Sequence, residues 1–336
     1  KSFTIRQYCH ERNIPFEDVG LPVEVETFSS YGLAFQKQFV PDVDDGEVVS
    51  VARCAEGFRL ELDDGRSFKS RNVVLGIGLE HFRNVPAELK SLPRNFISHS
   101  GEHGDLERFR GRTVAVIGAG SSAIDIATFL QEKGCNVHLI ARKQEIEFGH
   151  DEQLHRPLLS RIHRPMSGIG PGWKNILCAR LPGLFRHLPE GVRIRTVSSF
   201  LGPSGGWFMK TRFAAVPRLL GYELESAEVQ DGHVKLALVS SVGGKRHFTA
   251  DHIIAATGYK MDVQRLDFLC ADLRTELKLI RNTPRLSAHF ESSMPGLYFV
   301  GPISAMTFGP VMRFAAGAGF TAGRLSKHLK QAVSAA

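Results

Sequence analysis

The sequence predicts an α/β protein made of two related units, and three observations lead to that fold class. The chain has 336 residues, enough for two ordinary domains, and its 43% hydrophobic and 23% charged residues are typical of globular proteins. A strand, a glycine-rich turn and a helix follow one another around Gly118. A series of short strands that runs into an apolar strand occurs twice. Together these features predict two Rossmann-like units.

The first forty residues are predicted to form two helices. Ser2 can cap the first helix, and four aromatic residues give the second an apolar stripe at helical spacing. These aromatic residues are Phe28, Tyr31, Phe35 and Phe39. The pattern then changes to short strands.

Two meanders of short strands follow, and each runs into an apolar strand that ends in glycine. The first comprises residues 48–51, 58–62 and 67–69 and leads to residues 72–78, which include Gly76 and Gly78. The second comprises residues 224–229 and 233–238 and leads to residues 252–259. Two copies of one unit imply two related domains. The alternative is that meanders recur by chance in unrelated folds.

The strongest motif is the turn that joins the strand at residues 113–117 to the helix after it. Gly118 permits the tight turn, Gly120 lets the backbone approach a pyrophosphate, and Ala123 lets the helix lie close to the strand. Ser121 and Ser122 complete the motif, and the free amides and positive dipole end of the helix then face the phosphates. The flanking strand and helix favour a dinucleotide site over a merely structural turn.

The end of the next strand, residues 136–140, indicates which nicotinamide cofactor binds. A site for NAD would place Asp or Glu there for the ribose hydroxyls. This chain has Arg142 and Lys143, which suit the 2′-phosphate of NADP(H). The alternative is a solvated basic turn.

The two units are predicted to differ in completeness. No G-x-G-x-x-G precedes Gly118, so we expect the opening βαβ of the first unit to lie before Lys1. The expected division is a partial FAD-binding domain at 1–108, an NADPH-binding domain at 109–262 with an insertion at about 149–213, and a return to the first domain at 263–336. Glycine-rich loops of the insertion, at 168–173 and 205–207, line a substrate cleft or belong to a solvated connector.

Several motifs taken together resemble the class B flavin-dependent monooxygenases, which include flavin-containing, N-hydroxylating and Baeyer–Villiger enzymes. They are residues 118–125, His99-Ser100, residues 256–259 and residues 295–301. The resemblance extends from about Asn72 onward. It implies a glutathione-reductase-like architecture in which FAD and NADPH occupy separate Rossmann-like domains. The family's first G-x-G-x-x-G is not in this sequence, so this chain taken alone is expected to bind FAD poorly.

The resemblance also implies roles for individual residues. Gly76 and Gly78 would lie near the FAD diphosphate, and Gly301 and Pro302 would approach the flavin. Thr257 and Gly258 would lie at the cofactor end of their strand. Gly309 and Pro310 resemble the start of a helix that points at the isoalloxazine, although Pro310 is also an ordinary first-turn proline.

The resemblance implies an NADPH-dependent monooxygenase that oxygenates a small N-, S- or carbonyl-containing substrate with O₂ through a flavin hydroperoxide. The alternatives are a flavin reductase that only transfers electrons and a non-catalytic NADP-binding regulator. Catalytic side chains are hard to name, because the cofactors carry the difficult steps. Arg313 and His99 are the candidates, and surface or core roles suit them equally.

Composition narrows the partners and the compartment. The net charge of +7 suits an anionic partner, but no nucleic-acid-binding motif occurs, so phosphate-rich dinucleotides explain it better. No apolar run is long enough for a membrane span, and we expect no membrane partner. The five cysteines are scattered, which favours a reducing cytoplasm. Because no C-x-x-C occurs, a disulfide reductase is disfavoured. The spacing of His150, His155 and His163 fits no metal motif, so no metal is expected.

Overall fold

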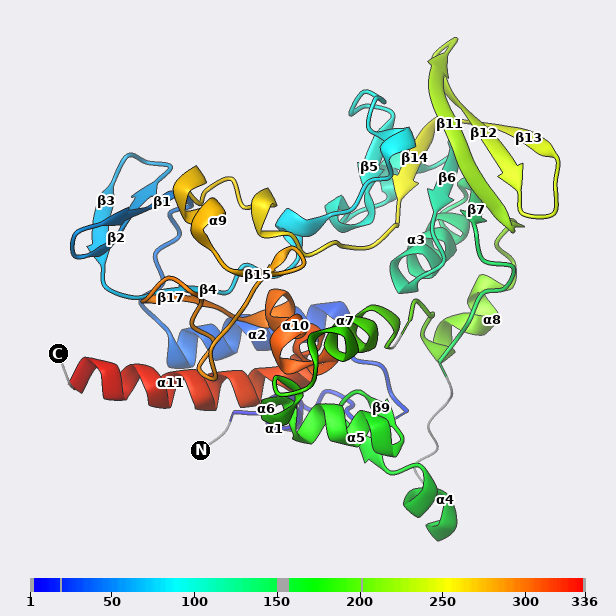
Figure 1. Cartoon of the computed structure of the whole chain (residues 1–336). Helices are drawn as coiled ribbons and strands as arrows, with labels where there is room; N and C mark the ends of the chain where they lie inside the picture. The colour runs from blue at the N-terminus through cyan, green and yellow to red at the C-terminus, as the bar shows by residue number, and fades with distance from the viewer. Residues whose placement is uncertain (1–2, 19, 150–156, 201, 335–336) are drawn as a thin grey trace.

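The computed structural model describes residues 3–18, 20–149, 157–200 and 202–334, and it shows two lobes (Figure 1). The sheet lobe contains a parallel sheet, one meander and helix α3 (Ser121–Glu132). The meander lobe contains the other meander, the C-terminal helices and most of the inserted helices. The α/β fold class with two related units is confirmed.

A five-stranded parallel sheet forms the centre of the sheet lobe, with strand order β10-β7-β6-β14-β5. The strands are β5 (Ile97–His99), β6 (Thr113–Ile117), β7 (Asn136–Ala141), β10 (Arg218–Leu220) and β14 (His252–Ala255). Every residue of β14 is buried, as expected for a central strand of a parallel sheet. Helices α3 (Ser121–Glu132) and α8 (Lys210–Phe213) cover one face, where Ile124 and Phe213 join one apolar cluster.

The predicted second meander covers the other face of this sheet. It consists of β11 (Tyr222–Gln230), β12 (His233–Ser240) and β13 (Lys245–Ala250), paired antiparallel. Alternate residues of β12 are buried, and Val234, Leu236 and Leu238 pack with Ala115 and Ile253 of the parallel strands. The two-residue periodicity that predicted the meander therefore also identifies its buried face.

The meander lobe repeats this arrangement in reduced form. Its meander is β1 (Val48–Cys54), β2 (Gly57–Leu62) and β3 (Ser67–Ser70), and it leads into β4 (Val73–Leu75). Strand β4 pairs in parallel with β17 (Leu297–Phe299), so the C-terminal part of the chain returns to the first lobe. The remaining short elements of this part are α9 (Ala271–Glu276), β15 (Leu279–Ile280), β16 (Thr283–Pro284) and α10 (Ala305–Phe308). Helix α11 (Ala318–Ser334) ends the described chain.

The inserted region contributes α4 (Leu158–His163), β8 (Met166–Ser167), β9 (Gly170–Pro171), α5 (Trp173–Arg180), α6 (Pro182–Phe185) and α7 (Glu190–Ser199). Its apolar side chains join the core of the meander lobe, where Phe185 and Val197 pack with Phe308. The end of the insertion turns back to the sheet lobe, because Met209 and Phe213 pack with the α3 cluster. The insertion therefore links the two lobes.

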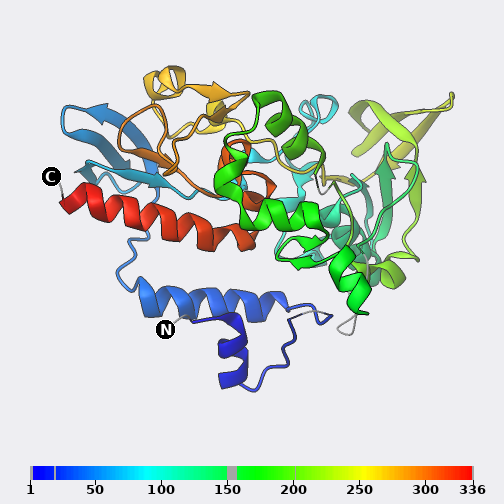
Figure 2. The ribbon, with the colours of Figure 1, turned by 60° about the horizontal axis from the view of Figure 1, so that its bottom comes forward.

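The two predicted N-terminal helices are present as α1 (Ile5–Glu11) and α2 (Val25–Phe39). The predicted cap was wrong: Thr4 is the N-cap of α1 and accepts a hydrogen bond from the Gln7 amide, while Ser2 lies outside the described residues. The aromatic stripe of α2 contacts Phe3, which stacks on Tyr31 with ring centroids 5.7 Å apart. Helix α2 has no buried residue, and Figure 2 shows it as a separate layer below α11.

Candidate functional site

The strand–turn–helix around Gly118 has the predicted geometry. Gly118 has φ +147°, and a Cβ there would collide with the carbonyl oxygen of Ala256 at the end of β14. The same Cβ would lie 3.3 Å from the Cβ of Ala123, so the two small residues let α3 begin close to the sheet. Gly120 is the N-cap of α3 and has no side chain to cap the helix.

A segment that sequence reasoning missed lies across this helix end. The hydroxyl of Ser121 donates to the carbonyl oxygen of Ser204 at 2.6 Å, and a Cβ on Gly120 would lie 3.3 Å from the Cβ of Pro203. Gly205 packs directly on Ile124 of α3. Part of the amide end of α3 is therefore covered by residues 203–205. The contact joins residues 83 positions apart, so no local pattern signals it.

The two predicted cations lie at the end of β7 in different surroundings. Arg142 is 3.6 Å from Glu223, and their side chains are 80% and 70% exposed. Lys143 pairs with Glu147 at 2.8 Å and also reaches the carbonyl oxygen of Pro203 at 3.4 Å. Arg142 is thus free to take a new anionic partner, whereas Lys143 holds the covering segment.

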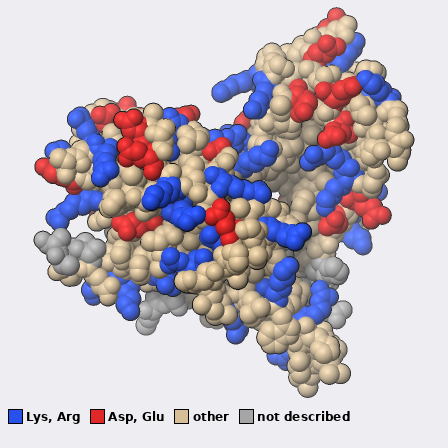
Figure 3. Space-filling view, in the orientation of Figure 1, with Lys and Arg blue, Asp and Glu red and all other residues tan. Residues whose placement is uncertain are grey.

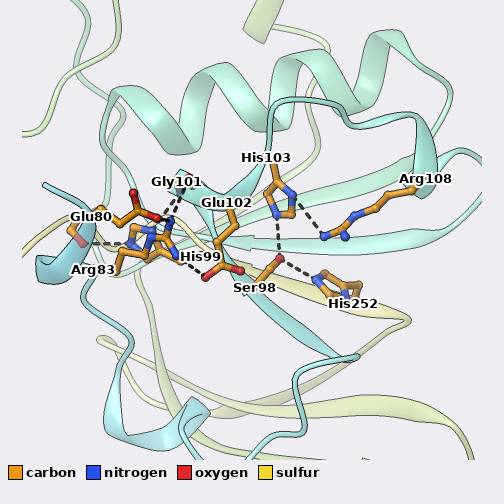
Figure 4. Close-up of polar contacts among 10 residues, drawn as sticks. Glu80, Arg83, Ser98, His99, Gly101, Glu102, His103, Arg108 and His252 are labelled. Atoms are coloured by element: carbon orange, nitrogen blue, oxygen red, sulfur yellow. Dashed lines mark hydrogen bonds and ion pairs between the residues drawn. The ribbon is translucent and has the colours of Figure 1, made fainter. Parts of the chain in front are cut away.

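His99 fixes the loop that contains Thr257 and Gly258. Its Nε2 donates to the carbonyl oxygen of Gly258 at 3.1 Å, and its Nδ1 accepts from the amide of Gly101 at 3.1 Å (Figure 4). Thr257 donates its hydroxyl to the carbonyl oxygen of Asn84. Because both ring nitrogens of His99 are used and burial lowers its pKa, the ring is neutral and acts as a structural link. This arrangement supports the core role for His99.

A chain of side-chain hydrogen bonds lies next to His99 (Figure 4). The carbonyl oxygen of Asn95 accepts from Nδ1 of His252 at 3.1 Å, so Nε2 of His252 accepts from the hydroxyl of Ser98 at 2.7 Å. The Ser98 oxygen then accepts from Nε2 of His103 at 2.8 Å, which leaves Nδ1 of His103 to accept from Arg108 at 3.3 Å. The carbonyl oxygen of Asn95 can only accept and the guanidinium of Arg108 can only donate, so these two ends set the direction of the hydrogen bonds between them. In this arrangement both imidazoles are neutral.

A pocket of about 500 Å³ is lined by several of the residues that the resemblance assigned to FAD. Its wall includes Gly76, Gly78, Gly301 and Pro302 together with Arg313. A Cβ on Gly78 or Gly301 would meet no atom within 4 Å, so both glycines face open space. Residues far apart in the sequence are therefore brought to one pocket, beside the first turn of α11.

A helical turn begins at Pro310, as expected, but it is not the start of the long helix. Residues 310–313 form one short 3₁₀ turn, and the long helix begins at Ala318. Gly309, with φ +93°, packs against the ring of Phe185 and Pro310 is buried, so neither lines the pocket. Arg313 donates to the carbonyl oxygen of Phe200 at 2.5 Å, and burial of its guanidinium lowers its pKa.

A cavity with a volume of about 1060 Å³ adjoins this pocket. Ala316 lines the cavity, while its neighbours Ala315 and Gly317 line the 500 Å³ pocket. Residues of both glycine-rich loops of the insertion complete the wall, among them Gly168, Ile169, Gly170, Pro171 and Trp207. The prediction that these loops line a cleft is confirmed. The cavity reaches Gly149 and Trp207, which flank the segment that covers α3.

Comparisons with known proteins agree with this geometry. Residues 26–165 match the family described as pyridine nucleotide-disulphide oxidoreductase. A ferredoxin–NADP reductase of Bacillus cereus (strain ATCC 10987 / NRS 248) is 30% identical over 151 residues, which are 43% of this chain and 42% of that relative. The chain thus matches less than half the length of this curated relative.

Solved structures match over nearly the whole chain. An ornithine hydroxylase of Pseudomonas aeruginosa has a TM-score of 0.75 at 18% identity, covering 97% of this chain and 81% of the other. An ornithine N-hydroxylase of Kutzneria sp. 744 has a TM-score of 0.74 at 17% identity, covering 97% and 80%. This chain has the fold of the ornithine N-hydroxylases. The bacillithiol disulfide reductase of Staphylococcus aureus is also similar, with a TM-score of 0.60 at 15% identity, covering 94% and 81%. The resemblance to N-hydroxylating monooxygenases is therefore confirmed at the level of the fold.

Two further expectations concerned a membrane-spanning helix and a metal site. No helix among the described residues has the length and apolar character needed to cross a bilayer. Of the histidines considered for a metal, His150 and His155 lie outside the described residues. His163, at the end of α4, belongs to no group of three or more potential ligands in the part of the chain that the structure describes.

Proposed function

We propose that this chain is part of an NADPH-dependent flavoprotein monooxygenase that oxygenates a small N-, S- or carbonyl-containing substrate. One observation carries the proposal: the 1060 Å³ cavity borders the glycine-lined pocket at Ala316 and the segment over the dinucleotide turn at Trp207. A substrate in this cavity would lie between the two expected cofactor sites. Such closeness is what hydride transfer and oxygenation require.

The residues at the dinucleotide turn fit NADP(H). Gly118 permits the close strand-to-helix turn that a pyrophosphate site needs, and the exposed guanidinium of Arg142 suits a 2′-phosphate. Residues 203–205 occupy part of the same helix end, so the binding of a pyrophosphate there requires this segment to move aside or to share the amides. Lys143 contacts the carbonyl oxygen of Pro203 in this segment, so it would link cofactor binding to the movement of residues 203–205.

The residues of the 500 Å³ pocket fit the flavin part of FAD. The open space beside Gly78 and Gly301 allows a planar ring system to approach the backbone, and the first-turn amides of α11 favour negative charge. When bound, the flavin accepts hydride from NADPH and activates O₂. The adenine end of FAD has no G-x-G-x-x-G in this sequence to receive it, and the expectation of weak FAD binding follows.

The chain's own residues shape the cavity and place the substrate. Ile169 and Ala316 supply the apolar part of the wall, while Asp18, Arg164 and Arg180 also line the cavity and make it partly charged. The amide of Asn175 is held by the carbonyl oxygen of Pro171 at 2.9 Å, which fixes the loop at 168–171. Arg313 is anchored on Phe200 and so positions the pocket wall without acting on the substrate.

The alternative of a flavin reductase rests on a specific observation, the match to a ferredoxin–NADP reductase. The two functions differ in the fate of the electrons. A monooxygenase uses one NADPH and one O₂ for each oxygenated product, whereas a reductase passes the electrons to an acceptor and inserts no oxygen.

The test measures NADPH oxidation and product together, on the longest natural form of the protein loaded with FAD. The probes are ornithine, lysine and cadaverine, on which structural neighbours act by name, with a thioether and a ketone as further classes. The proposal expects one probe to stimulate NADPH oxidation and to yield equimolar oxygenated product. Rapid reduction of a ferredoxin or an artificial acceptor, without oxygenated product from any probe, would replace it with the reductase.

A further inference from the structure

We propose that the surface formed by α4, α5 and α6 docks this protein onto an anionic lipid membrane. The surface consists of the exposed side chains of residues 157–185. It combines positive charge with exposed apolar side chains, which is the pairing that interfacial membrane binding requires. The proposal does not depend on the reaction that the protein catalyses.

Charge is concentrated in the insertion. Residues 149–213 contain ten of the 42 Lys and Arg residues but only three of the 35 Asp and Glu residues, which leaves 32 of each sign elsewhere. The insertion therefore accounts for the whole net charge of +7. Within residues 157–185 there are four Lys or Arg residues and no acidic residue. A local field of one sign attracts anionic lipid headgroups.

Several large apolar side chains of this surface are exposed to solvent. Leu158 and Leu159 on α4 are 74% and 73% exposed. Trp173 and Leu177 lie one turn apart on α5 and are both exposed, and Leu184 on α6 is exposed as well. An exposed tryptophan beside leucines is typical of a helix that lies in the membrane interface.

The apolar side chains form one continuous surface. The indole Nε1 of Trp173 donates to the carbonyl oxygen of Ile162 at 2.9 Å, which ties α4 to the start of α5. Ile162 is itself exposed. Figure 3 shows the projecting end of α4 as a largely tan surface bordered by blue Lys and Arg atoms. The apolar and cationic groups therefore lie on the same side of the molecule.

The cations of this surface are available to lipid phosphates. Arg161, Arg164, Lys174 and Arg180 are exposed and make no ion pair with any residue that the structure describes. Arg164 and Arg180 also line the 1060 Å³ cavity, so they lie where the surface meets the cavity. Lys174 lies 5.2 Å from the ring centroid of Phe200, which leaves its ammonium at the surface. Each such cation adds to the attraction without first giving up an ion pair.

The positive charge of this surface also favours an anionic bilayer over a second copy of this chain as its binding partner. In a twofold dimer through this face, two like-charged surfaces would meet and repel each other. Helix α2 offers the contrast, because it exposes Phe28 and Leu33 but has Glu24 and Glu26 beside Lys37. Its mixed charge favours no particular occupant, and no docking is assigned to it.

This proposal revises the expectation of no membrane partner. That expectation rested on the lack of an apolar run long enough to span a bilayer, and peripheral docking needs no such run. Helix α5 also faces the cavity, since Asn175 and Ala179 line it while Trp173 and Leu177 are exposed. Docking would therefore place the bilayer next to the cavity wall.

The test is flotation of the purified protein with vesicles of phosphatidylcholine plus phosphatidylserine, compared with pure phosphatidylcholine. We expect binding only to the anionic vesicles and a decrease in binding with added salt. Arg161→Glu/Lys174→Glu should lower the partition coefficient by at least about twenty-five-fold, from two cations at about fivefold each. Leu158→Ser/Leu159→Ser should lower it as well, because both side chains would enter the interface.

The controls carry the same chemical changes elsewhere on the surface. Lys90→Glu/Arg94→Glu changes the net charge equally, and Val242→Ser removes an apolar side chain that is 88% exposed. Both should bind vesicles like the wild type. Equal loss in the charge control, or no binding to anionic vesicles by well-folded protein, would overturn the proposal. So would a stable dimer in sedimentation experiments that Leu158→Ser/Leu159→Ser abolishes, since a second copy would then cover the surface.

Discussion

Arg142 lies 3.6 Å from Glu223 at the edge of the parallel sheet, and both side chains are mostly exposed. An exposed pair at this distance contributes well under 1 kcal/mol, so the guanidinium can leave Glu223 for a 2′-phosphate at little cost. We predict that Arg142→Ala raises the Kd for NADPH by about tenfold to a hundredfold, because a charge-assisted hydrogen bond is lost. The Kd for NADH should not change. Calorimetric titration with both cofactors measures the two constants.

Glu223→Gln is the matched control for this prediction. It removes the competing carboxylate but keeps the side-chain shape, so NADPH should bind as tightly as before or slightly more tightly. Equal weakening of NADPH and NADH in Arg142→Ala would contradict the assignment of the 2′-phosphate site. The basic turn would then be a solvated feature.

We predict that Gly118→Ala destabilises the sheet lobe. The added Cβ would collide with the Ala256 carbonyl oxygen, and φ +147° is unfavourable for a residue with a side chain. The free energy of unfolding should fall by more than about 1 kcal/mol, and NADPH binding should be lost. Urea denaturation and NADPH titration measure the two effects.

Gly323→Ala provides the opposite case for that experiment. Gly323 lies in α11, and a Cβ there meets no atom within 4 Å. Alanine favours the helix by up to about 1 kcal/mol over glycine, so this variant should be as stable as the wild type or more stable. Wild-type stability in both variants would show that the turn at Gly118 is not constrained as the structure indicates.

Much of this fold could be predicted from sequence because its signals are local. The alternation of buried and exposed residues in β12 and the glycines that end β4 and begin α3 lie within a few residues of one another. The cap at Thr4 and the late start of α11 at Ala318 were missed because several residues suit those positions equally well. Pro310 fits a 3₁₀ turn as readily as a helix start.

The candidate site was less predictable because contacts between distant residues form it. Ser121 meets Ser204, and Gly168 meets Ala316, with no pattern in the sequence that connects them. The family resemblance brought Gly76 and Gly301 together, which residue spacing alone would not have done. It gave no information about residues 203–205, so the covered helix end emerged only from the fold.

We predict that Gly168→Val narrows the cavity without disturbing either cofactor site. A Cβ on Gly168 would lie 2.8 Å from the Cβ of Ala316, so the larger side chain must displace the cavity wall. The kcat/KM for the substrate should fall by about tenfold or more, because small misplacements of a substrate are costly. Flavin content and the Kd for NADPH should stay unchanged. Steady-state kinetics and absorbance measure these quantities.

Gly104→Val is the control for the cavity variant. Gly104 lies in a loop where a Cβ meets no atom within 4 Å, so valine should leave the kinetics unaltered. Unchanged kcat/KM in Gly168→Val would mean that the substrate does not use this cavity. Loss of flavin in Gly168→Val would instead place the contact with Ala316 in the cofactor site.

His252 should make the stability of the sheet lobe depend on pH between about 6.5 and 4. Burial is the main cause that lowers its pKa to about 4, and repulsion from Arg108, His103 and Arg112 lowers it further. The hydrogen bond that Nδ1 donates to the carbonyl oxygen of Asn95 raises the pKa and offsets part of this shift. The unfolded chain takes up the proton first as the pH falls, so stability is full above pH 6.5 and declines until about pH 4. At 1.36 kcal/mol per pKa unit the loss is about 3 kcal/mol. The pKa of His103 is also lowered, so this residue adds to the loss of stability.

His252→Gln removes one titrating group and tests this prediction. Urea denaturation across this pH range should give a shallower pH dependence for the variant than for the wild type. Parallel curves for the two proteins would show that the chain from Asn95 to Arg108 does not require a neutral His252.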